Sequence, residues 1–365
     1  MKKTALLTLI ALSSFSSFAV AGSIQIYGRI DTGVIYDNFG GDTHKSDRVQ
    51  MASPNTPSRI GIQGTEEIDS DWSVGFRLEN RFASDSGDLK GGIKGDKLFE
   101  GASYLTVSNK KLGEVSMGRI SGLVSSSGIY DLQYYMDSFA GGTYGTGTAP
   151  INSGRMDNTF AYRTPMMAGF QGTLMYSMKT ETSEVGNEAT SDVDRYYAAG
   201  LRYNKGGLNL IGAYEEIEWG KKVPAAAKAS TSRKVATIGG SYRFEKVTAY
   251  LQSQYFNGLH SLDGFSKARD IKGFGIYGGT QFWYGISSWQ SMVYYRHYKV
   301  NTEDGINGHK ANLIGIATKY LYRPSKSIDI YVGGGFSRWD GQNSSTHKFV
   351  KDNHFNVFTG ITKYF

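Results

Sequence analysis

The sequence predicts an all-β protein, a 16-stranded antiparallel up-and-down transmembrane β-barrel. Three observations predict it. Gly accounts for 47 of 365 residues and is accompanied by 25 Tyr and 19 Phe, whereas the usual Gly usage is roughly 7%. Segments in which apolar and polar residues alternate follow one another along almost the whole chain. The polar connections between these segments are alternately long and short, which is how an outer-membrane barrel is built.

The first 21 residues have the order of a secretory signal peptide. Lys2 and Lys3 precede an apolar run, and Ala19-Val20-Ala21 supplies small residues before a cleavage site. We expect cleavage after Ala21, which leaves residues 22–365 as the barrel domain. Removal of the two lysines lowers the formal charge from +7 to +5, a modest value that does not indicate nucleic-acid binding. No later stretch approaches the roughly 20 apolar residues of a membrane helix.

The connections give the strand count. Eight long polar stretches and seven short turns make fifteen connections, hence sixteen strands, and their strict alternation places all short turns at one rim. The long stretches lie near 39–57, 84–97, 123–154, 181–194, 220–233, 259–269, 302–308 and 341–351, and the short turns near 69–71, 109–112, 165–169, 204–207, 245–246, 285–288 and 323–327.

The alternation within the strands indicates which face meets lipid. In the segment 72–82, Trp72, Phe76 and Leu78 share one parity, while Arg77 and Glu79 share the other. A closed protein core could not contain such charges unpaired, and sixteen strands enclose an interior too wide for side chains to fill. We therefore expect the apolar parity to face lipid and the charged parity to line an aqueous channel. The last segment, 353–365, alternates in the same way and ends on Phe365.

Five segments in order resemble the general diffusion porins of Gram-negative outer membranes. They are Ser23 to Asp31, Ser58 to Glu67, Gly113 to Arg119, Arg155 to Pro165, and Tyr320 to Tyr331. The resemblance implies a homotrimer in the bacterial outer membrane, in contact with lipid and lipopolysaccharide, with one water-filled pore per subunit. It also implies that the third loop, about 123–153 here, folds into the barrel and narrows the pore.

The resemblance also assigns residues to the constriction. Arg59, Arg119 and Arg155 match the wall arginines, with Arg29 as a further candidate, and Arg77 joins them by the parity of its strand. Asp131 and Asp137 of the loop are expected to face them, beside Tyr134 and Tyr135. Arg119 shares the parity of two apolar residues, so a β-bulge or the end of the strand is needed to turn it inward.

An excess of arginine over aspartate at the constriction predicts a mild anion preference, because the excess sign sets ion selectivity. The channel would pass small hydrophilic solutes and ions by passive diffusion. Replacing Arg59, Arg119 and Arg155 by Ala is expected to shift permeability towards cations, measured as the reversal potential in a salt gradient. An arginine held in a salt bridge to the third loop would contribute to shape instead.

Other functions have weaker support. A channel specific for sugars or oligosaccharides is the alternative, since Tyr130, Tyr134, Tyr135 and Tyr144 gather in the third loop. The sequence contains no recognisable nucleophile motif of an outer-membrane hydrolase, so we expect no enzymatic activity. The G-x-G-x-x-G match at 273–278 lies inside a strand and opens no helix, which argues against a dinucleotide site. Cys is absent and the six His are scattered, so neither a metal nor a cofactor is expected.

Overall fold

The computed structural model describes residues 22–42, 45–89, 97–139, 150–180, 186–224, 228–263, 268–302, 309–342 and 349–365. The expected signal peptide, residues 1–21, lies outside the described residues. Among the described residues, no helix has both the length and the apolar character needed to cross a membrane.

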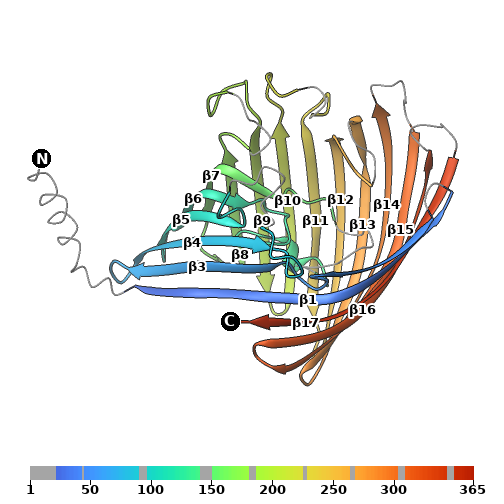
Figure 1. Ribbon diagram of the computed structural model, residues 1–365. Helices are drawn as coiled ribbons and strands as arrows, with labels where there is room; N and C mark the ends of the chain where they lie inside the picture. The colour runs from blue at the N-terminus through green and yellow to red at the C-terminus, as the bar shows by residue number, and fades with distance from the viewer. Residues whose placement is uncertain are drawn as a thin grey trace, which may run out of the picture.

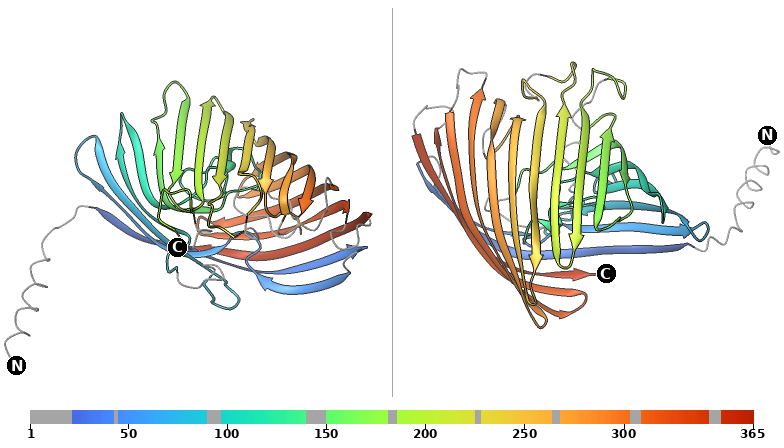
Figure 2. Two further views of the ribbon diagram at one scale, coloured as in Figure 1. Left: turned by 90° about the horizontal axis from the view of Figure 1, so that it is seen from above. Right: turned by 180° about the vertical axis from the view of Figure 1, so that it is seen from behind.

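The described residues form one antiparallel sheet that closes on itself, with β1 beside β17 (Figure 1). Figure 2 shows the same wall from above and from behind. The strands are β1 (Ser23–Gly41), β2 (Ser46–Ala52), β3 (Ser58–Glu67), β4 (Trp72–Phe82), β5 (Ala102–Asn109), β6 (Gly113–Ser121), β7 (Arg155–Arg163), β8 (Phe170–Ser177), β9 (Arg195–Lys205), β10 (Leu208–Glu218), β11 (Arg233–Arg243), β12 (Val247–Leu259), β13 (Ala268–Tyr284), β14 (Ser287–Thr302), β15 (His309–Ser325), β16 (Ile328–Gln342) and β17 (Phe349–Tyr364).

These seventeen strand segments occupy sixteen positions in the barrel. β3 pairs with the first part of β1, over 23–29, and β2 pairs with the later part, over 33–39. The two segments therefore share one position beside β1, and the predicted 16-stranded barrel is confirmed. The prediction that 39–57 is a single long polar connection is wrong. This stretch contains the strand β2, in which the alternating residues Val49 and Met51 are both exposed.

The segment between β2 and β3 leaves the sheet because of its composition. Pro54 and Pro57 have no backbone N–H to donate to a ladder. Serine hydroxyls satisfy the backbone of β1 at this gap: Ser53, Ser58 and Ser84 donate to the Asp31 carbonyl oxygen at 2.8, 3.1 and 2.6 Å. The Ser58 hydroxyl also accepts the N–H of Asp31. The segment thus turns into the barrel with its serine hydroxyls bonded to the backbone of β1.

All seven short turns predicted from the sequence fall between consecutive strands at one rim, from the β3–β4 turn to the β15–β16 turn. The predicted faces are also confirmed. Along β1, Ile24 and Ile26 are 69% and 68% exposed, whereas Asp31 and Ile35 are fully buried. Large apolar side chains therefore face outward and charged ones face inward, as a barrel in a lipid bilayer requires.

The described part of the third loop, 122–139 and 150–154, lies against the inner wall. Gln133, in the short 3-10 helix η1 (Gln133–Tyr135), bonds to Gln252 of β12 at 2.9 Å. Inward-facing glycines make room for the loop. A Cβ at Gly200 would lie 2.7 Å from the Leu132 side chain, and one at Gly239 would lie 3.0 Å from the Met136 sulfur. Apolar loop residues such as Phe139 fill the space against β13 to β15.

The terminal Phe365 continues the pairing of β1. It exchanges two backbone hydrogen bonds with Gly28, at 2.9 and 3.1 Å, and its ring covers Gly28, where an added Cβ would lie 2.5 Å from the ring. We expect deletion of Phe365 to lower the temperature at which the purified barrel unfolds in detergent. Phe365→Tyr, which keeps the ring, should unfold near the original temperature. Equal unfolding temperatures for the deletion and the unmodified protein would contradict this.

Candidate constriction site

Three arginines lie side by side across neighbouring strands of the inner wall. Arg29 of β1 is directly paired with Arg59 of β3, which is directly paired with Arg81 of β4. We call these three residues the arginine row. Like charges placed opposite one another across strands destabilise a sheet. Carboxylates offset this repulsion for two members of the row, because the buried Glu79 binds Arg59 and the buried Glu100 binds Arg81.

Glu79 is the centre of the first charge network. Its two carboxylate oxygens accept hydrogen bonds from Arg59 at 3.0 Å and Arg77 at 2.8 Å. The Tyr27 hydroxyl donates to the same carboxylate at 2.9 Å and accepts from Arg77 at 2.5 Å. Four side chains from three strands are thereby held rigidly. The role of Tyr27 carries no signal in the sequence, whereas Glu79 shares the inward parity of Arg77.

Glu100 and Asp157 are the other carboxylates of this wall. Arg81 binds Glu100 through two parallel contacts of 2.6 Å, the fork geometry that suits a guanidinium. Asp157 pairs with Arg119 and with Lys97, at 2.5 and 2.6 Å. Glu100 precedes β5 in a connection, where no alternation predicts the direction of a side chain, so the sequence did not mark it as a site residue.

A β-bulge turns Arg119 towards the other arginines. The β6–β7 register shifts between Gly118 and Ile120. Gly118 has φ +136°, and a Cβ there would lie 2.2 Å from the Ser103 carbonyl oxygen. Only glycine fits this backbone conformation and this close approach. A bulge thus turns Arg119 inward although its neighbours of the same parity are apolar. Its guanidinium group donates to the Glu100 carbonyl oxygen at 2.7 Å.

Arg29 and Arg155 differ from the arginines held by carboxylates. Their guanidinium groups donate to backbone carbonyl oxygens, of Pro57 at 3.1 Å and of Gly101 at 2.5 Å. Among the described residues, the structure shows no ion pair for either side chain. In this described group, the six guanidinium groups of Arg29, Arg59, Arg77, Arg81, Arg119 and Arg155 thus share three carboxylates, those of Glu79, Glu100 and Asp157. The structure therefore brings together all five arginines predicted from the sequence, Arg29, Arg59, Arg77, Arg119 and Arg155.

The loop aspartates point elsewhere. Asp131 is buried and its Oδ1 accepts the backbone N–H groups of Ser125 and Gln133, at 3.1 and 2.9 Å. Asp137 is also buried, and it accepts the N–H of Phe139 at 2.8 Å and the Gln133 side-chain amide at 3.2 Å. These bonds fix the turns of the loop itself. Within the described residues, both carboxylates accept hydrogen bonds from the loop, whereas Arg59, Arg77, Arg81 and Arg119 bind carboxylates of the wall.

The two predicted tyrosines have different surroundings. Tyr134 is 44% exposed and donates to the Ser126 carbonyl oxygen. Burial and Asp131 raise the pKa of its hydroxyl, while the guanidinium groups of Arg59 and Arg29 oppose that rise. Tyr134 is thus a residue of the described part of the loop that interacts electrostatically with the arginine row. The ring of Tyr135 is covered by the Arg202 guanidinium, 3.6 Å from its centroid.

Asp131 gives the loop a pH dependence. Burial raises its pKa to about 7, and the negative charge of Glu215 adds to the rise, against backbone N–H groups that lower it. A carboxyl group whose pKa is raised on folding favours the folded state most below its ordinary pKa of about 3.9. That contribution is lost as the pH rises through 7. Glu215 in turn interacts with the Arg233 guanidinium and accepts a hydrogen bond from the Tyr196 hydroxyl.

We therefore expect Asp131→Asn to raise the unfolding temperature of the channel at pH 8 relative to the unmodified protein and to leave it almost unchanged at pH 4. The amide keeps an acceptor for the two loop N–H groups but does not ionise. Thermal unfolding in detergent across this pH range measures the difference. A constant difference between the two proteins from pH 4 to pH 8 would contradict the assignment to Asp131.

Among the residues that the structure describes, no group of three His, Asp or Glu side chains is placed to hold a metal ion.

Comparisons with known proteins agree on one family. The family model described as Gram-negative porin matches residues 7–342. An outer membrane porin protein of Bordetella pertussis is 26% identical over 93% of this chain and 94% of its own length. Outer membrane porin protein 32 of Delftia acidovorans is 27% identical over 70% of each chain.

Solved structures share the fold. An anion-selective porin from Comamonas acidovorans superposes with a TM-score of 0.67 at 24% identity, covering 94% of this chain and all of the other. The trimer form of OmpT of Vibrio cholerae superposes with a TM-score of 0.60 at 14% identity, again covering 94% of this chain and all of the other.

Proposed function

Because the chain belongs to the Gram-negative porin family, we propose that the outer-membrane channel it forms is water-filled and passes small hydrophilic solutes and ions with a mild preference for anions. The fold and the family indicate a channel rather than an enzyme. Residues 1–21 would be removed on export, and outward-facing side chains such as Ile24 and Ile26 would meet lipid and lipopolysaccharide.

The observation that carries the anion preference is the excess of guanidinium groups over carboxylates on one wall. Arg59, Arg77, Arg81 and Arg119 are bound to carboxylates. Within the described residues, the guanidinium groups of Arg29 and Arg155 bond to backbone carbonyl oxygens and to no carboxylate, so their charge would act on ions in the pore. Arginine keeps that charge at any physiological pH. The anion selectivity named for the porin from Comamonas acidovorans is consistent with this proposal.

We also propose a homotrimer, in line with the trimer form of OmpT. Of the small outward positions that could allow close packing, Gly28 and Gly64 are covered by Phe365 and Phe76 of the same chain, whereas no atom lies within 4 Å of the Cβ position of Gly212. Mass determination in detergent tests the assembly.

A channel specific for sugars through the loop tyrosines has less support. Tyr130 is buried and its hydroxyl bonds to Ser116 at 2.7 Å, and Tyr135 is covered by Arg202. Tyr144 lies outside the described residues. The exposed Tyr134 alone does not form a row along which sugars could stack.

Planar-bilayer recording tests the proposed function. We expect a conductance that is independent of voltage and a partition of neutral poly(ethylene glycol) molecules into the pore that decreases with their size. In a potassium chloride gradient, we expect a reversal potential whose sign shows that chloride is more permeant than potassium. Absence of conductance would reject the channel, and a potential of the opposite sign would reject the anion preference.

A further inference from the structure

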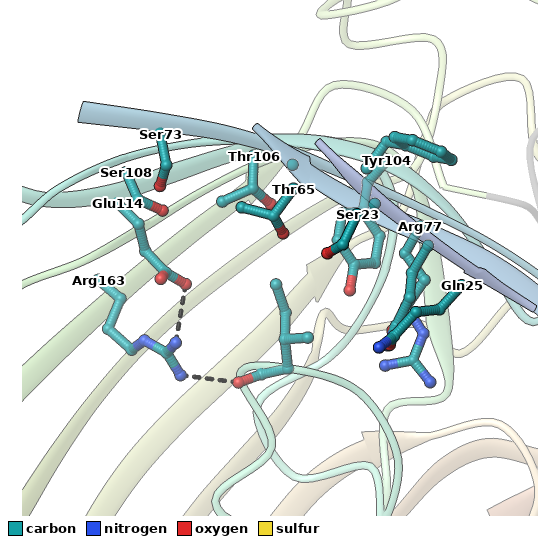
Figure 3. Close-up of a pocket in the computed structure, with 15 residues that line it drawn as sticks. Ser23, Gln25, Thr65, Ser73, Arg77, Tyr104, Thr106, Ser108, Glu114 and Arg163 are labelled. Atoms are coloured by element: carbon teal, nitrogen blue, oxygen red, sulfur yellow. Dashed lines mark hydrogen bonds and ion pairs between the residues drawn. The ribbon is translucent and has the colours of Figure 1, made fainter. Parts of the chain in front are cut away.

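A pocket of about 300 Å³ lies on the inner wall between the arginine row and the short-turn rim (Figure 3). It is built on β1 and β3 to β7, and Ile129 of the third loop closes one side. Ser23 and Arg29 are six residues apart on β1, which is roughly 20 Å along a strand. The pocket therefore begins at Arg77, beside the constriction, and extends along the diffusion path towards the short-turn rim.

The side chains of the pocket form rows set by the strand register. Ser23 is opposite Thr65, and Ser73 is opposite Ser108. Gly75, opposite Thr65, has no side chain and leaves the hollow between these rows. Figure 3 shows the hydroxyls of Ser73, Ser108 and Thr65 directed into the same space. We call this the hydroxyl pocket, lined by Ser23, Thr65, Ser73, Thr106 and Ser108.

The charged groups of the hydroxyl pocket compensate one another. Arg163 binds Glu114 at 2.8 Å and donates to the Ile129 carbonyl oxygen at 2.8 Å, as the dashed lines in Figure 3 show. Arg77, at the other end, is held by Glu79 and Tyr27. Among the described charged groups of the pocket, each guanidinium is paired with a carboxylate, so an entering ion meets no unpaired opposite charge. The pocket thus lacks the excess charge of the arginine row.

Several hydroxyls of the pocket have unused hydrogen-bonding capacity. Thr106 bonds to Ser116 at 2.5 Å. The structure shows no side-chain hydrogen bond within the described residues for Ser23, Thr65, Ser73 or Ser108. A hydroxyl both donates and accepts, and so does the amide pair of Gln25 and Gln63, which are 3.3 Å apart. These groups match a ligand whose own hydroxyl groups donate and accept.

We propose that the hydroxyl pocket is a binding site for a neutral polyhydroxylated solute of the size of a monosaccharide. The inference rests on the proposed water-filled channel and adds a place where an uncharged solute pauses before it leaves by the short-turn rim. A second hollow of about 240 Å³ at that rim shares Ser73, Ser108, Glu114 and Arg163 with it and continues the path outward. The combined space is at the small end of ligand sites.

The test is single-channel recording with glucose or sorbitol added on the short-turn side. We expect a saturable decrease in conductance, while poly(ethylene glycol) of the same hydrodynamic size, which has few hydroxyl groups, gives only the unsaturated decrease of a space-filling solute. Thr65→Val with Ser108→Ala removes two hydroxyls and should weaken the apparent sugar affinity about tenfold, since each hydrogen bond contributes a few-fold. Gly75→Val should weaken it independently by filling the hollow.

Ser241→Ala is the matched control, because Ser241 faces inward near the same rim on β11, outside the pocket. It should leave the sugar effect unchanged. A sugar effect that is absent, that poly(ethylene glycol) reproduces, or that both pocket variants retain would overturn the inference. The same recordings give the reversal potential. If the channel conducts and prefers anions but shows no sugar effect, the sugar-binding site is rejected and the proposed function stands. If the protein shows no conductance, the proposed function itself is rejected.

Discussion

Replacing Arg29 and Arg155 together by Gln is expected to remove the anion preference of the channel while leaving the barrel folded. Among the residues that the structure describes, both side chains donate to backbone carbonyl oxygens, of Pro57 and Gly101, and to no carboxylate, and glutamine can still donate one hydrogen bond. A unit charge about 4 Å from an ion contributes ~1 kcal/mol in water. Two such charges would contribute about 2 kcal/mol at that distance, an upper limit of roughly thirtyfold. An ion in a wide pore stays farther away, so the chloride-to-potassium permeability ratio should fall severalfold, measured as the reversal potential in a salt gradient.

Two controls separate a local effect from a change in total charge. Lys111→Gln with Lys326→Gln removes the same two charges from exposed turn residues and should leave the reversal potential unchanged. Glu79→Gln removes a carboxylate that neutralises Arg59 and Arg77 and should shift the potential the other way, towards stronger anion preference. If the arginine variant and the lysine variant behave alike, the two arginines do not set the selectivity.

Replacing Asp31 by Ala is expected to cause the largest loss of stability. This residue is fully buried in β1, and its carboxylate accepts hydrogen bonds from the Tyr331 hydroxyl, the Thr362 hydroxyl and the Asn55 N–H. It thereby joins β16, β17 and the inward segment between β2 and β3. A buried donor left without a partner costs about 1–3 kcal/mol, so the loss of the carboxylate should cost on the order of 3–5 kcal/mol.

Thermal unfolding in detergent, followed by the mobility of the folded barrel on gels, measures this loss. Asp31→Asn retains an acceptor oxygen of the same shape and should lie between the alanine variant and the unmodified protein. Ser241→Ala, at a buried β11 position for which the described residues show no side-chain hydrogen bond, should unfold close to the unmodified protein. An alanine variant that unfolds at the original temperature would show that the three strands do not depend on Asp31.

The strand arrangement could be predicted well because it follows from local geometry. Successive side chains of a strand point to opposite faces, so the alternation of Trp72, Phe76 and Leu78 with Arg77 and Glu79 assigned lipid and pore faces without further information. Turn residues marked seven boundaries correctly. The prediction of the first connection was wrong because Ser-Pro-Asn-Thr-Pro-Ser at 53–58 interrupts one barrel position between β2 and β3. Its polar composition alone does not distinguish it from a surface loop.

The sequence by itself determined the number of barrel positions, the rim of the short turns and the outward and inward faces, and it proposed five of the six arginines that the structure groups on one wall, without Arg81. Each of these depends on residues close together in the chain. Only the tertiary structure decided which charges are neutralised. Arg59 meets Glu79 through strand pairing, Arg119 turns inward at a bulge, and Asp131 bonds to its own loop. Hydrogen bonds and ion pairs need atoms within about 3 Å, and the fold alone brings distant residues that close.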